Sequence, residues 1–80
     1  MFYVYILQNP AGYFYVGQTS NIGERLARHN SGRSRYTRGR GPWKLAYSEE
    51  YETREEACQR EREIKGWKSS SRIQELIAVS

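Results

Sequence analysis

The beginning of the chain alternates between side chains that would face opposite sides of an extended backbone. Aromatic and β-branched residues recur with a period of two over residues 2–7 and again over residues 13–18, which is typical of strands. Between these segments, positions 9–12 read Asn-Pro-Ala-Gly, a composition typical of turns. The sequence therefore predicts an N-terminal hairpin.

The two faces of this predicted hairpin differ in chemistry. One face carries apolar core residues, namely Val4, Ile6, Phe14 and Val16. The other face is mostly phenolic and carries Tyr3, Tyr5, Leu7, Tyr13, Tyr15 and Gly17. Taken alone, a tyrosine-rich face favours a structural interpretation, with ring packing and hydroxyls at the solvent rim.

A short helix is predicted after the hairpin. Asn21 and Glu24 have the spacing of a capping box, and Gly32 stands where a helix C-terminal glycine is expected. Arg25 and His29 are four residues apart, so they share a helix face and can both point into a cleft beside the hairpin. Alternatively, His29 is a satisfied, semi-buried histidine or a cation near the helix C-terminus, and Arg25 is a solvated neighbour.

The second half of the chain predicts one strand and two helices. Trp43, Leu45 and Tyr47 alternate as a third strand. Thr53 with Glu56 forms a second capping box, and a run of three serines can cap a last helix. The apolar positions of these two helices are Ala57, Ile64, Trp67, Ile73, Leu76 and Ile77.

The expected fold class is α+β, with a small three-stranded, mainly antiparallel sheet flanked by about three helices in the order β-β-α-β-α-α. A chain of 80 residues buries roughly 60% of its unfolded surface, so we expect a single domain over residues 1–80. Only 14 residues are Leu, Ile, Val or Phe. Seven Tyr and two Trp supply further apolar area.

One acidic residue interrupts the apolar stripe of the penultimate helix. Position 61 lies four residues after Ala57 and three before Ile64, and Glu61 occupies it. A core-facing carboxylate costs free energy unless it is paired or binds a cation. We therefore expect a functional role for Glu61. The structural alternative is an ion pair with Arg25 or with a residue of a neighbouring strand.

The inventory of reactive residues excludes several classes of protein. The chain has no Asp, so sites built on clustered aspartates are excluded. One Cys and one His cannot form a disulfide, a Cys/His zinc site or a redox cysteine pair. No glycine fingerprint for nucleotide binding occurs. Because no leader and no apolar run of ~18 residues is present, we expect a cytoplasmic protein that does not bind membranes.

Charge is distributed unevenly along the chain. Residues 1–22 carry no charge, residues 23–47 carry +6, residues 48–63 carry −4 and residues 64–80 carry +2. The basic segment mixes Arg with Gly, Ser and Tyr, and its candidate phosphate ligands are Arg33, Arg35, Arg38, Arg40 and Lys44. Arg binds phosphate bidentately and an interleaved Tyr can stack on a base, which favours nucleic-acid binding. The alternative is a solvated loop that keeps the protein soluble.

Together these residues resemble the GIY-YIG nuclease family. The resemblance rests on Tyr3-Val4-Tyr5, Tyr15-Val16-Gly17, Arg25, His29 and Glu61. Two such tripeptides about ten residues apart on a predicted hairpin, followed by Arg, His and Glu on later helices, form a specific pattern over most of the chain. Four further segments look like the small bacterial stand-alone branch, close to the nuclease domain of structure-specific resolvases: Asn30-Ser31-Gly32, Tyr36-Thr37-Arg38-Gly39-Arg40-Gly41-Pro42, Glu56-Ala57 and Arg60-Glu61.

The resemblance implies a divalent-metal-dependent phosphodiesterase that cleaves DNA. It implies Tyr5 as general base, Tyr15 as a partner that positions water or phosphate, and Arg25 as the clamp on phosphoryl charge. Glu61 would hold the metal, and His29 would be an auxiliary donor. Because a free phenol has a pKa of ~10, Tyr5 acts as a base near neutral pH only if Arg25 or metal-bound water favours the phenolate. Family members differ over which Tyr takes the proton, so Tyr15 stays an alternative.

A single protein carboxylate suits one Mg²⁺ or Mn²⁺ ion whose other ligands are water and phosphate oxygens, and it does not suit a two-metal clamp.

Three departures from the family pattern stand out. Tyr3 replaces the first Gly, Gln18 and Thr19 stand where some members carry Lys, and no Asn follows Glu61. These departures predict activity that is weak or depends on a partner.

The leading hypothesis is a small structure-selective or repair-type endonuclease for branched, flapped or damaged DNA. Its sequence specificity should be low, because phosphate contacts position a substrate without specifying its sequence. A protein partner or a homodimer is left open. The rival hypothesis is a non-catalytic nucleic-acid-binding module on the same scaffold. A third, a protein-interaction domain that uses exposed Tyr and Trp, predicts no salt-dependent DNA affinity.

Overall fold

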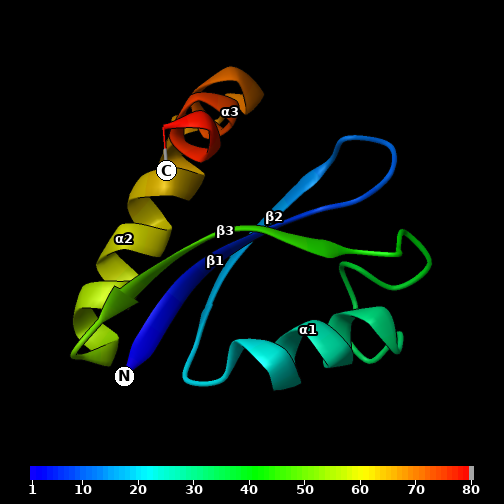
Figure 1. Ribbon diagram of the computed structural model, residues 1–80, viewed down its shortest axis with the longest axis horizontal. Coiled ribbons are helices and arrows are strands. Elements are labelled where there is room, and N and C mark those ends of the chain that lie inside the picture. Colours follow the sequence, from blue (N-terminus) through cyan, green and yellow to red (C-terminus); the bar gives the residue numbers. More distant parts are fainter. Residues whose placement is uncertain (80) are drawn as a thin grey trace.

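The computed structural model describes residues 1–79 and contains three strands and three helices in the order β-β-α-β-α-α (Figure 1). The elements are β1 (Phe2–Gln8), β2 (Phe14–Thr19), α1 (Ile22–Asn30), β3 (Lys44–Tyr51), α2 (Arg54–Trp67) and α3 (Ser70–Ala78). The sheet has the strand order β2-β1-β3, and both pairs are antiparallel. The predicted α+β class and element order are confirmed.

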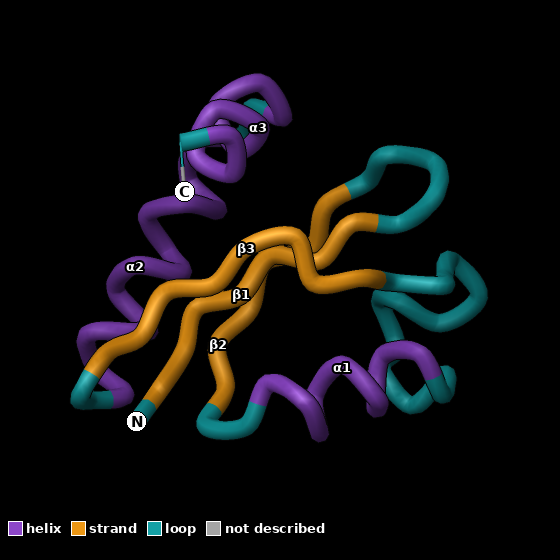
Figure 2. The backbone as a smooth tube through the Cα atoms, in the orientation of Figure 1, coloured by secondary structure: helices purple, strands orange, loops and turns teal. Residues whose placement is uncertain are grey.

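The sheet separates two layers of different composition. Helices α2 and α3 lie on one side of it, and α1 with the loop that follows lies on the other (Figures 1 and 2). The first side packs the aliphatic residues Val4, Ile6, Val16, Ala57 and Ile64. The second side packs Tyr5, Leu7 and Trp43, with Tyr15 and Leu26 at its margin. The two predicted faces of the hairpin are therefore confirmed, except that Tyr13 lies in the turn and is exposed.

Strand β3 departs from the simple alternation predicted for it. A register shift between Ile6 and Leu7 pairs Ile6 with Tyr47 but Leu7 with Leu45. Because directly paired residues point to the same side of a sheet, Leu45 and Tyr47 point to opposite sides. An irregularity of this kind inserts one residue into a strand, so a period-two pattern across it assigns the wrong face.

The ends of α1 follow the predicted capping signals. Oδ1 of Asn21 accepts a hydrogen bond from the Glu24 N–H at 3.0 Å. At the other end Gly32 has a φ of 81°, and the N–H groups of Gly32 and Arg33 donate to the carbonyls of His29 and Arg28. This Schellman-type ending directs the chain into the loop over residues 31–43, which we call the arginine-rich loop.

The remaining helices also begin at predicted caps. Thr53 and Glu56 form a reciprocal capping box at the start of α2, and Ser69 caps α3. Helix α2 continues through Gly66 and ends at Trp67, before a left-handed residue at Lys68. Within residues 1–79, no helix has the length and apolar character needed to cross a membrane.

Candidate active site

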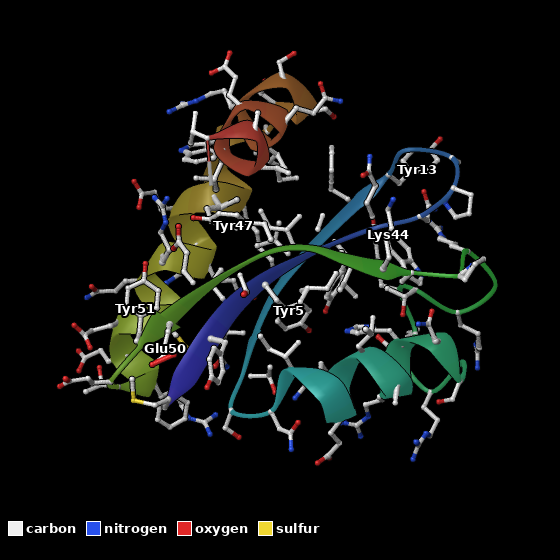
Figure 3. The ribbon with its side chains drawn as sticks, in the orientation of Figure 1. Tyr5, Tyr13, Lys44, Tyr47, Glu50 and Tyr51 are labelled. Atoms are coloured by element: carbon white, nitrogen blue, oxygen red, sulfur yellow. The ribbon has the colours of Figure 1, made fainter. Side chains whose placement is uncertain are left out.

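Tyr5 lies on the central strand and points from the sheet toward α1 (Figure 3). Its hydroxyl is 3.0 Å from Nε2 of His29, and Nδ1 of His29 is 2.7 Å from Oγ1 of Thr37. Tyr5 and Thr37 are 1% exposed and His29 is 2% exposed. We call these three residues the buried relay, because their hydrogen bonds link a strand, a helix and the arginine-rich loop.

Gly17 explains how the ring of Tyr5 can lie over the neighbouring strand. Gly17 is the residue of β2 that pairs with Tyr5. A Cβ atom at this position would lie 2.5 Å from the Tyr5 hydroxyl oxygen and 2.7 Å from Cζ. These distances are shorter than non-bonded contacts, so a side chain on Gly17 would displace Tyr5 from His29.

The arginine-rich loop is anchored to the rest of the site despite its polar composition. The amide side chain of Asn30 donates to the Trp43 carbonyl at 2.9 Å and accepts from the Trp43 N–H at 2.6 Å. The Trp43 indole N–H donates to the Thr37 carbonyl at 3.0 Å, and Asn9 donates to the Arg40 carbonyl at 3.1 Å. These bonds hold Thr37 in place against His29.

Tyr15 and Arg25 surround the relay and set its electrostatics. The ring centroid of Tyr15 lies 4.7 Å from that of His29 and 6.2 Å from that of Tyr5. Burial, and then the charge interaction with Tyr15, raise the pKa of Tyr5 to about 12, although Arg25 acts in the opposite direction. Burial, Arg25 and Arg28 lower the pKa of His29 below 6.5. Both Tyr5 and His29 are therefore neutral at pH 7.

Both ring nitrogens of His29 are engaged inside the protein. When Nδ1 carries the proton, it donates to Thr37 and leaves Nε2 free to accept the Tyr5 hydroxyl proton. His29 is thus a buried histidine with both nitrogens hydrogen-bonded, which is one of the alternatives that the sequence left open. In this geometry His29 acts on Tyr5.

Glu61 lies on α2 at the margin of the apolar stripe. Its side chain is 20% exposed, and Oε2 accepts from Nζ of Lys65, which is 51% exposed, at 2.8 Å. The structural alternative was an ion pair with Arg25 or with a strand residue, but the partner of Glu61 is a lysine one turn further along α2. The charge of Glu61 contributes to the raised pKa of Tyr5. Helix α2 therefore brings Glu61 within electrostatic range of the buried relay.

The residues present fit a lightly held divalent cation. Residues 1–79 contain no group of three or more His, Cys or acidic side chains that could hold a metal ion. Glu61 offers one partly exposed carboxylate whose partner is a solvent-facing lysine. Mg²⁺ usually keeps several waters and binds one or two carboxylates together with substrate phosphate, so this donor set suits such an ion.

The five predicted phosphate ligands all lie at the surface. Arg33, Arg35, Arg38, Arg40 and Lys44 are each exposed. Four of them belong to the arginine-rich loop, whose Thr37 reaches inward to His29. The same loop therefore presents cations to solvent and completes the buried relay.

A second polar cluster lies on the opposite side of the sheet. Glu49 of β3 accepts from Arg60 Nε at 2.9 Å and from Arg60 Nη2 at 3.1 Å. It also accepts from the hydroxyls of Tyr47 and Tyr51, which lie on the α2 side in Figure 3. We call these four residues the Glu49 cluster. Glu49, and not Glu61, is the acid that is held by a permanent internal counter-charge.

The sequence did not predict the roles of several residues of the site. Thr37, Asn30 and Trp43 act through contacts that depend on how the loop returns to the sheet. Lys65 stands four residues after Glu61, and this spacing was an available signal for an ion pair.

Comparison with known proteins places these features in context. The model of the GIY-YIG catalytic domain matches residues 1–74. A UPF0213 protein from Clostridium perfringens is 44% identical over 81 residues, which cover 100% of this chain and 87% of the relative. A UPF0213 protein from Natronomonas pharaonis is 39% identical over 77 residues, which cover 95% and 89%. The solution NMR structure of a UPF0213 protein from Bacillus halodurans superposes with a TM-score of 0.63 at 36% identity, covering 100% of this chain and 86% of that one.

Proposed function

This chain belongs to the GIY-YIG family, and we propose that it is a divalent-metal-dependent endonuclease acting on DNA. The family match indicates a nuclease with a nucleic-acid substrate. The observation that carries the proposal is the buried relay, which lies beneath an exposed, arginine-rich loop and within electrostatic range of Glu61. We further propose that the substrate is branched, flapped or damaged DNA, cut with low sequence specificity.

The relay gives Tyr5 a way to act as a base without existing as a phenolate. Its pKa of about 12 makes a free phenolate unfavourable at neutral pH. The hydroxyl can instead give its proton to Nε2 of His29 as the oxygen accepts one from the attacking water. Thr37 fixes the orientation of the imidazole through Nδ1. In this scheme Tyr5 is the catalytic residue and His29 a positioning residue that also holds the proton.

The surrounding side chains supply the other functions of a phosphodiesterase. Tyr15, half-buried beside Tyr5, would position the water or a phosphate oxygen. Arg25 would stabilise the negative charge that develops on the phosphoryl group. Glu61 would hold the cation, which when bound neutralises phosphate charge and activates water. Lys65 must release Glu61 for this, and the exposure of Lys65 makes that release inexpensive.

The decisive experiment compares cleavage and binding in the same variants. Tyr5→Phe and Glu61→Ala are assayed on branched, flapped and plain duplex DNA with Mg²⁺ or Mn²⁺. Loss of a general base or a metal ligand should lower the cleavage rate at least about 100-fold while DNA binding is kept. Tyr13→Phe and Glu63→Ala serve as matched controls, because both residues are exposed and Glu63 lies on the same helix as Glu61.

The same experiment separates the rival functions. If the wild type and all variants bind DNA equally and none cuts it, the protein is a nucleic-acid-binding module. If none binds DNA in a salt-dependent manner, a protein-interaction domain is the better interpretation. Cleavage by Tyr5→Phe at the wild-type rate, together with loss in Tyr15→Phe, would transfer the role of base to Tyr15.

A further inference from the structure

A cavity of about 310 Å³ lies next to the candidate active site, and the mechanism above assigns it no ligand. Three of its lining residues, Phe14, Tyr15 and Val16, are consecutive on β2. Tyr36 of the arginine-rich loop and Lys65 of α2 complete the lining. Because the ring of Tyr15 also contacts His29, the cavity adjoins the buried relay.

Tyr36 is an aromatic residue that folding leaves largely uncovered. Its side chain is 53% exposed, although its ring lies 5.5 Å from that of Tyr15 and the Arg40 guanidinium lies 5.0 Å from its centroid. Most aromatic side chains stabilise the fold through burial of their rings, and the exposed part of Tyr36 adds no such stabilisation. Its ring nevertheless contacts an arginine and a second tyrosine.

The chemistry of the lining suits a planar ring that is attached to a phosphate. The tyrosine and phenylalanine rings supply stacking surfaces, and Lys65 and Arg40 supply positive charge at the border. Strand β2 is at the edge of the sheet, so alternate residues direct backbone N–H and C=O groups away from β1. These groups can bond the polar edge of a base. The volume lies at the lower end of the range for ligand pockets, roughly 300–1,000 Å³.

We propose that this cavity receives one unpaired nucleobase of the substrate, stacked on Tyr36, beside the phosphate that is cut. The proposal rests on the proposed nuclease function and defines its substrate class. A base inside an intact duplex is stacked and paired, so it can enter only after it has been unstacked and unpaired, which costs free energy. A flap, a junction or a single strand presents such a base without that cost. Stacking tolerates all four bases because each has a π-face.

The test uses a DNA flap that carries 2-aminopurine, a fluorescent base, at the unpaired position next to the junction. A matched fully paired duplex carries the same base. Binding is measured without divalent metal, so cleavage is not required. We expect the fluorescence of the unpaired probe to be quenched by the wild-type protein, and that of the duplex probe to stay nearly unchanged.

Substitution of Tyr36 provides the second arm. Tyr36→Leu should lose the quenching and bind the flap about 5- to 100-fold more weakly, the range expected for loss of one stacked base. Its affinity for the plain duplex should be unchanged. Tyr36→Phe keeps the ring and should behave as the wild type. Tyr13→Leu is the matched control, because Tyr13 is also exposed but lies in the β1–β2 turn, outside the cavity.

The possible results distinguish failure of the cavity proposal from failure of the proposed nuclease function. Equal weakening of flap and duplex binding by Tyr36→Leu, or no weakening of either, overturns the cavity proposal, even if the wild type cleaves DNA. Quenching that depends on Tyr36 in a protein that never cleaves DNA supports the cavity and rejects the nuclease. A fluorescence change of equal size on both probes also overturns the cavity proposal, because the bound base would not need to be unpaired.

Discussion

The two sides of the sheet use the same kinds of polar residue to opposite effect. On the α2 side, the Glu49 cluster joins a carboxylate, two tyrosines and an arginine. On the α1 side, the buried relay contains a tyrosine and a histidine, Tyr15 and Arg25 lie around it, and Glu61 acts from the edge. The difference lies in the partners. Both oxygens of Glu49 are bound by Arg60, whereas Glu61 has one solvent-facing lysine.

Electrostatics follow the same division. Burial opposes ionisation of Glu49, but the hydrogen bonds from Arg60, Tyr47 and Tyr51 outweigh it and hold the pKa of that carboxyl below its usual value. Burial and Glu49 together raise the pKa of Tyr47 and of Tyr51 to about 12. The residues of the Glu49 cluster therefore satisfy one another's charges and hydrogen bonds, and both carboxylate oxygens already have partners. Residue type alone does not mark a functional site. A polar group whose partners can be displaced by a ligand is a better indication.

The largest effect on folding should come from neutralising Glu49, with Glu61 as the comparison. Glu49→Gln removes the charge that Arg60 and two tyrosines share, so we expect the free energy of unfolding to fall by about 2–3 kcal/mol. Glu61→Gln removes only a pair with an exposed lysine and should change it by less than about 0.5 kcal/mol. Urea denaturation followed by circular dichroism measures both. Equal losses in the two variants would contradict the distinction between the two sides.

A methyl group on Gly17 should have the next largest effect. Gly17→Ala places a Cβ against the buried Tyr5 hydroxyl, and such overpacking typically costs about 1–3 kcal/mol. Gly66→Ala is the matched control, because a Cβ there has no heavy atom within 4 Å and alanine favours the helix by about 0.5–1 kcal/mol. Opposite signs in urea denaturation are expected. A neutral Gly17→Ala would mean that Tyr5 has room to move.

The pH dependence of stability should separate the two sides. Because His29 has a lowered pKa in the folded protein, the unfolded chain takes up a proton first, and stability falls as the pH drops below about 6.5. Glu49 also has a lowered pKa, but its contribution is lost only at lower pH, as the pH falls below the unfolded value of 4.5.

Two variants can show which residue causes each loss of stability at low pH. His29 is the only histidine of the chain, so His29→Gln should remove the decline near pH 6.5 and leave the acidic one. Glu49→Gln should do the reverse. Thermal unfolding at a series of pH values measures this. Persistence of the upper decline in His29→Gln would contradict the assignment.

The smallest effect is expected from the surface cations. Replacing Arg35 and Arg38 together by Ala should weaken DNA binding and flatten its dependence on salt by up to about two units, one for each lost phosphate contact. Arg62 and Lys68 are exposed on the α2 side, and replacing both by Ala should leave that slope unchanged. Binding titrations at several salt concentrations measure the slopes. Similar slopes in the two double variants would remove the arginine-rich loop from the proposed interface.

The sequence predicted those features that depend on neighbours close along the chain. The faces of β1 and β2 follow from alternation, and the caps at Asn21, Thr53 and Ser69 follow from local hydrogen-bonding rules. The interruption of the stripe by Glu61 was visible for the same reason. Each of these features is decided within about one helical turn or one strand.

The missing features depend on contacts between distant segments. The register shift in β3 was invisible because periodicity assumes regular pairing. Arg60 reaches Glu49 across eleven residues, and Asn30 reaches Trp43 across thirteen. The composition of the basic segment could not show that Asn30 and Trp43 anchor the arginine-rich loop. That its cations bind phosphate remains a prediction.

The anchors of the arginine-rich loop have a consequence for how related chains can diverge. Asn30 and Trp43 fasten the two ends of the loop to each other, so the loop leaves and rejoins the rest of the fold at one place. In the proposed function, adding or removing residues between these two points would change how the loop meets DNA. Because Thr37 lies between them, it would also shift the hydrogen bond to His29. Loop length is therefore coupled to the geometry of the buried relay.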